Sequence, residues 1–474
     1  MAPIDTTKDR PAVPAAGPGR DLHDVLDHVR GFAPLDGFPG VDEIVDRADR
    51  IAAAHPDVVA RRRIGTSRLG EPLHEYVVGD GPDVLVIGGV HPNEPIGFHT
   101  ALQLLDDLAA GVGPAAAAGA RWHVVPCIDP DGARLNESWF ADPGDRVDYA
   151  RGFYRPAPDE QVEWSFPLDH GTAYFDRSIP EAVAVARLVD RLRPAMVVGL
   201  HNGELGGVYY YLDRDVDGVV PALQELPARL GLPLDRGEPE TPESVPHAPG
   251  VFRTLSSAGT HDWLVEQGID PAGHVSGGGL ADYVAPYGSV TFVAELPYWS
   301  HADSDDVSDA GVPYADVLRR KADGLTELGA VLTEALDRAR PHLRIDSPLR
   351  RASEVFVPHM ALAGRAERER AATVEPGRSA TVAEVFSNGD LVRCFRLRYG
   401  SMLHRALTAE VVAGTAAPQV RAARDELGRH LEAWYAEARS VTGLTTWPVE
   451  RLVAVQYAST VLVAAATVRE RGRA

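Results

Sequence analysis

The sequence has few cysteines and no strongly apolar start, and each shortage excludes a class of protein. Its only cysteines, Cys127 and Cys394, lie far apart and form neither a disulfide framework nor a cysteine-based zinc site. Any bound metal must therefore use histidine and carboxylate ligands. Residues 1–20 contain no apolar core of signal-peptide length and are expected to form a disordered lead-in, so a cytoplasmic location is the default expectation.

Positive charge is also scarce. The chain of 474 residues has 47 Lys and Arg against 68 Asp and Glu, which gives a formal net charge of −21. Because phosphate contacts need a basic surface, this balance argues against a nucleic-acid partner. The apolar run within residues 452–474 is too short to span a bilayer and is expected to be a buried helix, so no membrane partner is expected.

The order of helical and strand patterns predicts an α/β fold. Helical patterns alternate with short strands, and the segments "DVLVIGGV", "AMVVGLH" and "SVTFVAELPYW" are apolar almost throughout. Strands of this kind are typical of a mixed or parallel sheet that is covered by helices on both faces. A long loop from Asp129 to about Pro180, rich in Arg, Asp, Pro and aromatic residues, suggests a functional surface.

The C-terminal part has a different character. A long helical pattern runs from Tyr314 towards Leu343, and the pattern beyond residue 345 is almost entirely helical. We therefore expect a lead-in at 1–20, an α/β domain at 21–344, and a helical domain or appendage at 345–474. Dimerisation, covering of an active site and binding of a partner all remain open as roles of the helical part.

Polar side chains follow four of the predicted strands. They are His91 with Glu94, then Asp131, His201 and Glu295. In open sheets of this class, ligands bind at the carboxyl ends of the strands. His91, Glu94 and His201 would form a His2Glu set, which is typical of catalytic zinc sites that leave a fourth position for water. Glu295 would then be the general base that takes a proton from that water.

Each of these residues also has a structural interpretation. His91 and His201 are candidates for ordinary loop or core histidines, Glu94 for a carboxylate at a helix start, and Glu295 for a buried acid paired with arginine. Taken singly, the structural interpretation is favoured for each residue, because short motifs often match by chance. Taken together, the four favour a metal site.

Several longer segments extend the pattern in a fixed order: "GGVHPNEPIG", "PCIDPDGARLN", "GLHNGELGGVYYY" and "SGGGLADYVAPYGSVTFVAELPYW". With them, residues 40–340 resemble the zinc carboxypeptidase family. The resemblance implies a three-layer α/β/α fold with a mixed eight-stranded sheet. It also implies zinc bound by His91, Glu94 and His201, and Glu295 as general base.

The chain departs from that family where substrate is bound. The family's Asn-Arg pair, whose Arg binds the substrate carboxylate, is absent from the corresponding stretch at 159–170, "DEQVEWSFPLDH". Arg134, Arg151 and Arg155 lie in the same long loop and are candidates to replace that Arg in binding substrate. Arg134 is the first candidate for stabilising the oxyanion or binding substrate. Arginines in such a loop are more often solvated or paired with Asp.

Two further residues are candidates for substrate binding. His274 occupies the neighbourhood of a tyrosine that the family places on a mobile loop, although an ordinary loop histidine is the simpler interpretation. Tyr283 suits either a pocket wall or a packed aromatic side chain.

Three functions remain open. The first is zinc-dependent hydrolysis of a peptide or peptide-like amide bond, as in a carboxypeptidase acting on a small substrate. The second is N-acyl-amino-acid deacylation of the succinylglutamate desuccinylase or aspartoacylase type. The third is a non-catalytic binding protein on the same fold, against which the intact Glu295 speaks. A homo-oligomer formed through the C-terminal helices is a further expectation.

Overall fold

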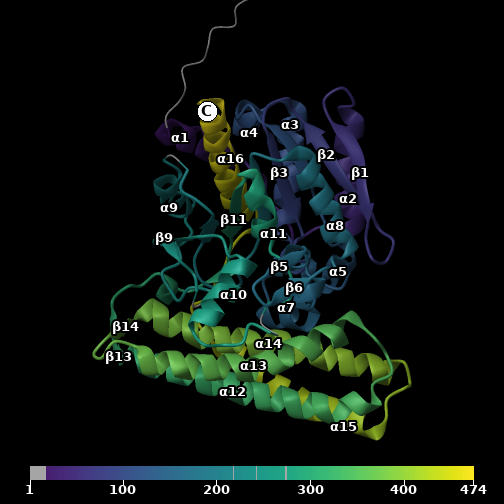
Figure 1. The fold of residues 1–474 in the computed structure, drawn as a ribbon, viewed down its shortest axis with the longest axis vertical. Coiled ribbons are helices and arrows are strands. Elements are labelled where there is room, and N and C mark those ends of the chain that lie inside the picture. The colour runs from purple at the N-terminus through teal and green to yellow at the C-terminus, as the bar shows by residue number, and fades with distance from the viewer. Residues whose placement is uncertain (1–17, 217, 242, 273–274, 474) are drawn as a thin grey trace, which may run out of the picture.

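The computed structural model describes residues 18–473 except 217, 242 and 273–274 (Figure 1). Residues 1–17 of the predicted lead-in therefore lie outside the described residues.

A mixed sheet forms the centre of the larger part of the molecule. Its four central strands, β4, β3, β7 and β11, run parallel, and antiparallel pairings add β2 beside β4 and β8 beside β11. Among the described residues nine strands pair in this sheet, one more than the resemblance implied, and two very short strands form the edge beyond β8. In spatial order the strands are β1 (Ala60–Thr66), β2 (Pro72–Val78), β4 (Arg121–Val125), β3 (Asp83–Gly88), β7 (Met196–His201), β11 (Val290–Glu295), β8 (Tyr209–Leu212), β10 (Val251–Phe252) and β9 (Pro246–Ala248).

Helices cover both faces of the sheet, which confirms the predicted three layers. Alternate residues of a strand point to opposite faces. Val84 and Val86 of β3 therefore join the core cluster that includes α2 (Val41–Ala54), α3 (Ile96–Ala110) and α16 (Val449–Arg473). Leu85 and Ile87 join the cluster formed with α8 (Pro180–Leu192) and α11 (Leu280–Val284). Burial on both sides explains why these strands are apolar throughout.

The last helix, α16, packs against the sheet layer and α1 (Pro18–Val29). Among the described residues it is the one helix that length and composition would allow to cross a membrane, so the sequence argument from its length was wrong. Its most apolar window is 83% buried inside the protein, as expected of a core helix. Gln456 on this helix donates from Nε2 to the backbone oxygen of His201 at 2.7 Å, which ties the helix to the end of β7.

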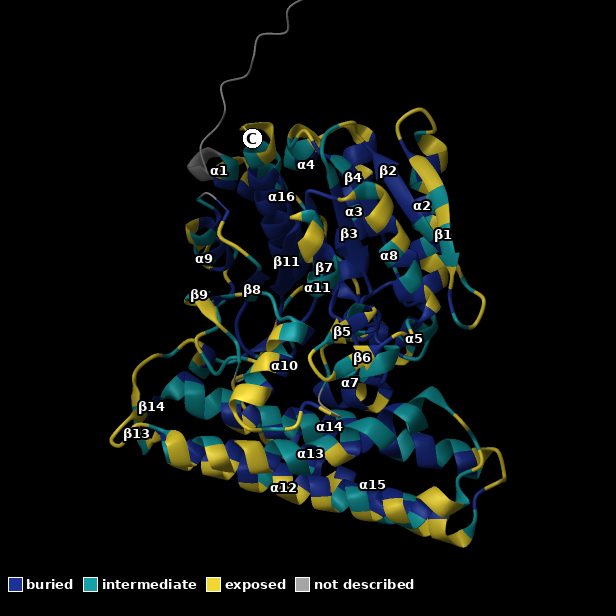
Figure 2. Ribbon diagram, viewed as in Figure 1, coloured by how far each residue is buried: buried dark blue, intermediate teal, exposed yellow. Residues whose placement is uncertain are grey.

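Four long helices form a second region below the sheet (Figure 1). They are α12 (Tyr314–Ala339), α13 (Pro348–Thr373), α14 (Val382–Val412) and α15 (Pro418–Ser440). Residues coloured as exposed are frequent along α12, α13 and α15 (Figure 2). α14 lies next to the α/β part, where Asp390 forms a two-bond ion pair with Arg146 at 2.7 and 2.6 Å. The division expected at residue 344 stays a prediction, with α12 placed among the long helices and α16 beside the sheet.

The segment from Asp129 to Pro180, expected to be a loop, contains short helices and a hairpin. Buried Asn136 holds the segment together, because its side chain bonds the backbone oxygens of Gly132 and Tyr154 and the backbone N–H of Tyr154. The remaining elements are α4 (Gly113–Ala117), α5 (Pro130–Arg134), α6 (Glu137–Phe140), α7 (Arg146–Gly152), β5 (Leu168–His170), β6 (Ala173–Phe175), α9 (Val219–Arg229), α10 (Ser257–Glu266), β12 (Trp299–Ser300), β13 (Asp309–Pro313), β14 (Ser379–Thr381), β15 (Thr445–Thr446) and the 3-10 turns Pro158–Glu160, Val162–Trp164, Ala285–Tyr287, Ala302–Ser304 and Arg340–His342.

Candidate active site

Three neighbouring parallel strands bring the predicted metal ligands and base to one edge of the sheet. β3 ends just before His91, β7 ends at His201, and β11 ends at Glu295, which is in register with His201. Glu94 follows on the turn into α3. Gly97 lets that helix pack closely on β7, since a Cβ at this position would lie 2.7 Å from Cβ of Leu200.

The three predicted ligands are in contact. Oε2 of Glu94 lies 3.1 Å from Nδ1 of His91 and 3.0 Å from Nδ1 of His201, and the two imidazole centroids are 4.7 Å apart. All three residues are at most 4% exposed. In a tetrahedral zinc site with bonds of about 2.0–2.1 Å, neighbouring ligand atoms lie about 3.3 Å apart. The two distances from Oε2 of Glu94 to the histidine nitrogens are close to this spacing, so the donor types and these contacts fit a zinc ion.

His201 supplies further evidence for a cation at this place. Both of its ring nitrogens are buried and lie against carboxylates, Nδ1 at 3.0 Å from Glu94 and Nε2 at 3.5 Å from Glu163, without a well-oriented hydrogen bond to any of the described residues. Burial opposes its charged form, yet the carboxylates of Glu163 and Glu94 raise the pKa of His201 well above its usual value. The same negative charge favours a divalent cation, and buried ligand atoms without hydrogen bonds are expected at a metal site.

His91 is held neutral, the form in which imidazole binds metals. Burial, with a further contribution from the charge of Arg155, lowers the pKa of His91 to about 4.

Glu163 is a member of the cluster that the sequence did not reveal. Its Oε2 lies 3.4 Å from Nε2 of His91 and 3.5 Å from Nε2 of His201, on the opposite side of the rings from Glu94. Ligand atoms of these three residues all lie within 4.8 Å of one another. Glu163 belongs to the stretch at 159–170, which lacks the Asn-Arg pair and was not predicted to contribute a carboxylate to the metal cluster.

Glu295 lies next to the cluster, with Oε1 3.7 Å from Nδ1 of His201. It is 7% exposed. Burial raises the pKa of its carboxyl well above the usual range, and the charges of Glu94 and Glu240 act in the same direction. A buried carboxyl with a high proton affinity beside a metal cluster suits a general base.

Of the three predicted arginines, the structure brings only Arg155 to the cluster. Its guanidinium donates to Oε1 of Glu94 at 2.6 Å and lies 3.0 Å from Nε2 of His91. Arg134 instead bonds Asp42 at 2.6 Å and Glu71 at 2.8 Å, outside the lining of the pocket described below. The oxyanion role predicted for Arg134 has no support from its position, because these two carboxylates hold its guanidinium elsewhere.

The other substrate candidates also lie elsewhere. Arg151 bonds Asp148 at 3.2 Å and stacks over the ring of Tyr435. Tyr283 packs against Phe166, with ring centroids 5.0 Å apart, and donates to Asp190 at 2.9 Å, so its position agrees with a packed aromatic side chain. Both residues are absent from the described lining of the pocket. His274 lies outside the described residues.

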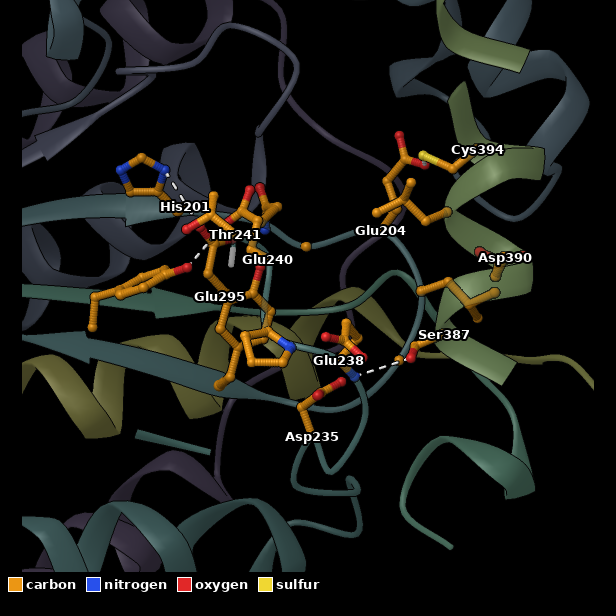
Figure 3. Close-up of a pocket in the computed structure, with 18 of the residues that line it drawn as sticks. His201, Glu204, Asp235, Glu238, Glu240, Thr241, Glu295, Ser387, Asp390 and Cys394 are labelled. Atoms are coloured by element: carbon orange, nitrogen blue, oxygen red, sulfur yellow. Dashed lines mark hydrogen bonds and ion pairs between the residues drawn. The ribbon is translucent and has the colours of Figure 1, made fainter. Parts of the chain in front are cut away.

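A cavity of about 380 Å³ opens beside the metal cluster. Its walls come from the strand ends, the segment 235–241, and α14 of the long-helix region (Figure 3). On the α14 side, Cys394 donates to Glu204 at 2.8 Å, and burial raises the pKa of this thiol well above its usual value. A long helix beyond the predicted α/β domain therefore forms part of the pocket.

A second group of two histidines and one acid lies on the hairpin β5–β6 and α10. Nε2 of His170 and Nδ1 of His261 lie 2.7 and 3.0 Å from Oδ1 of Asp262. It was not predicted from the sequence.

Comparison with known proteins agrees with this geometry. The family model for zinc carboxypeptidases matches residues 44–229, a range that includes His91, Glu94 and His201. Residues 44–229 belong to the zinc carboxypeptidase family. This part of the chain matches a family of zinc-dependent hydrolases, and zinc is the metal that the set of His91, Glu94 and His201 fits. The match ends before Glu295, so the role of that residue depends on its position in the structure.

Among solved structures, the chain is similar to carboxypeptidase A from Helicoverpa armigera, with 14% identity and a TM-score of 0.36 over 76% of this chain and 81% of that one. Bovine thrombin-activatable fibrinolysis inhibitor gives 15% identity and a TM-score of 0.35 over 54% and 86%. Murein-tripeptide amidase from Escherichia coli O157 gives 19% and 0.27 over 51% and 88%. No curated protein matches the chain.

Proposed function

We propose that this zinc carboxypeptidase-type enzyme hydrolyses an amide bond of a small peptide or peptide-like substrate. The observation that carries the proposal is the meeting of His91, Glu94 and His201 at one sheet edge, with Glu295 directly beside them. His91, Glu94 and His201 would hold the ion, and bound zinc supplies the positive charge that polarises a scissile carbonyl and acidifies water.

The chain's own residues supply the proton transfers. Oε1 of Glu295 accepts a proton from the attacking water and returns it to the leaving nitrogen, so that a carboxylate and an amine are released. We assign the stabilisation of negative charge on the former carbonyl oxygen to Arg155, because its guanidinium contacts Glu94 and His91. Burial of the cluster excludes water and strengthens both interactions.

The pocket gives less support to deacylation of N-acyl amino acids. Recognition of an acyl carboxylate needs a cation that is free to pair with it. Each arginine and lysine in the described lining already contacts a carboxylate of the chain. A binding-only role is disfavoured by Glu295, because binding alone does not require a base.

The test is hydrolysis of a mixed panel of short peptides and N-acyl amino acids, followed by mass spectrometry. Wild type, chelator-treated protein and Glu295→Gln are compared at equal concentration. We expect cleavage by wild type only, with a loss of about 10²–10⁴-fold in Glu295→Gln while its zinc content stays at the wild-type level. Full activity in Glu295→Gln would contradict the assignment of the base, and cleavage of acyl amino acids alone would favour the deacylase.

A further inference from the structure

The charge of the pocket wall bears on which substrate the enzyme accepts, and this inference rests on the proposed function. Every cation in the described lining is neutralised within the chain. Arg155 pairs with Glu94 at 2.6 Å, Lys321 with Glu367 at 2.6 Å, and Arg398 with Glu204. Little positive charge therefore remains to attract a substrate carboxylate.

Four carboxylates of the pocket wall, unlike these cations, have no partner of opposite charge among the described arginines and lysines. Glu163, Asp235, Glu240 and Glu295 form no ion pair with an arginine or lysine in the part of the chain that is described. Figure 3 shows Glu240 and Glu295 close to His201, with Asp235 and Glu238 further along the wall. Glu238 differs from its neighbours because it pairs with Arg370.

The partners of Asp235 and Glu240 leave the negative charge of these two carboxylates uncompensated. Asp235 accepts the backbone N–H groups of Gly207 and Gly237 at 3.1 and 3.0 Å, and Glu240 accepts the hydroxyl of Tyr211 at 3.0 Å. These donors are neutral. Burial raises the pKa of Asp235 to about 6, so it is mostly ionised at pH 7.5. A bound zinc ion offsets charge at the cluster, and the charge of Asp235 and Glu240 remains.

An independent feature of the same wall also suits a cation. The rings of Tyr209, Tyr211 and Phe252 line the pocket beside Glu240, with centroids 5.9 to 6.4 Å apart. Aromatic faces attract ammonium and guanidinium groups, and they also pack against the methylene chain that carries such a group. The side chain of Glu295 is nine-tenths buried, lies 3.7 Å from His201 and lines the same pocket.

We infer that the pocket selects peptide-like amides with an ammonium or guanidinium group on the part that lies against residues 235–241. Glu240 is the specificity residue, because it is exposed to the pocket and pairs with no cation of the chain. Recognition of a positive charge on the substrate by Glu240 would thus replace recognition of a substrate carboxylate, for which an Asn-Arg pair is needed.

The experiment uses zinc-loaded full-length protein and dipeptide amides that differ only in one side chain: lysine, norleucine or glutamate. Each is placed in turn on either side of the scissile bond, and kcat/KM is measured. We expect lysine to be preferred over norleucine by at least 10-fold on one side, and glutamate to be the poorest. In Glu240→Gln the ratio of lysine to norleucine should fall about 10-fold, mainly through KM, and in Glu240→Lys it should invert.

Glu266→Gln is the matched control, because Glu266 is an exposed carboxylate of α10 that does not belong to the pocket lining. It should keep the wild-type ratio. A ratio unchanged in Glu240→Gln, or a preference for glutamate, would overturn the inference while leaving amide hydrolysis established.

Binding provides a readout that does not depend on turnover. Calorimetry compares lysine amide with norleucine amide on the zinc-loaded wild type and on Glu240→Gln. The inference expects at least 10-fold tighter binding of lysine amide by wild type and a smaller difference in the variant. Equal affinities would overturn it, whatever the hydrolysis panel shows. Absence of hydrolysis with preferential binding of lysine amide would count against the proposed function alone.

Discussion

The molecule contains two pairs of histidines beside acids, and they differ in a way that shows what makes a metal site. His91 and His201 lie with centroids 4.7 Å apart, and His170 and His261 lie 5.1 Å apart, both pairs edge to face. Each pair has a carboxylate within contact. The first pair is buried, whereas the side chains of His170 and Asp262 in the second are 37% and 59% exposed.

Hydrogen bonding separates the pairs more sharply than burial does. The backbone N–H of Thr172 donates to Nε2 of His261 at 3.2 Å, so Nδ1 must carry the ring proton. Nδ1 then donates a hydrogen bond to Asp262. A metal on Nδ1 would require that proton to leave a ring whose other nitrogen is already an acceptor. His201 has no such partner at either nitrogen among the described residues. The residue types would allow a metal at either pair, but the hydrogen bonding favours a metal only at His91 and His201.

The largest expected effect tests this difference directly. His201→Ala should lose bound zinc, because it removes a ligand, whereas His261→Ala should retain one zinc per chain. Metal content after dialysis against zinc-free buffer measures both. The Tm of wild type and of His261→Ala should rise on adding zinc, and that of His201→Ala should not. Loss of zinc in His261→Ala, or its retention in His201→Ala, would reverse the comparison.

Asp129 provides a third case for comparison, because it has a buried oxygen atom without a hydrogen bond to the described residues and belongs to neither histidine group. Its Oδ1 accepts the N–H of Gly132 at 2.9 Å, but Oδ2 bonds none of the described residues. Burial raises the pKa of Asp129 to about 7 from 3.8. The folded state therefore prefers the protonated acid, and stability falls as pH rises from about 4 to about 7. Protonation therefore neutralises the buried Asp129, whereas at His201 a bound metal would occupy the buried nitrogen.

Asp129→Asn should remove this pH dependence, because an amide resembles the protonated acid. The variant should match wild type near pH 4 and exceed its free energy of unfolding by on the order of 2–4 kcal/mol at pH 8. Urea unfolding at several pH values measures the difference. A difference that stays constant across the range would show that Asp129 does not titrate between pH 4 and 8.

Glu163→Gln tests whether the second carboxylate matters to the metal. With zinc held on the Nδ1 side, Nε2 of His201 carries a proton, and Oε2 of Glu163 lies 3.5 Å from it. Loss of such a partner weakens metal binding by about 10–100-fold. Competition with a zinc-binding dye measures the affinity, and Glu163→Asp should recover part of it. Wild-type affinity in Glu163→Gln would contradict the role.

The ligands were predictable and the arginines were not, for a physical reason. His91, His201 and Glu295 follow apolar strands, and parallel pairing brings the carboxyl ends of such strands together. Arg134 and Arg155 lie in a segment without periodicity, so sequence does not show that Arg134 meets Asp42 and Glu71 while Arg155 meets Glu94. The part of α14 in the pocket was equally hidden, since it depends on how the long helices dock.

Asp262→Asn should have the smallest effect. Hydrogen bonds with His261 and then His170 lower the pKa of Asp262, so the stabilisation is present above its unfolded value and is lost as pH falls through the lower folded value. Solvent screens this exposed carboxylate, so the Tm at pH 7 should fall only slightly and the zinc content should not change. Differential scanning calorimetry and metal analysis measure both. A large fall in zinc content would show that a second ion is bound at His170 and His261, where hydrogen bonding argues against one.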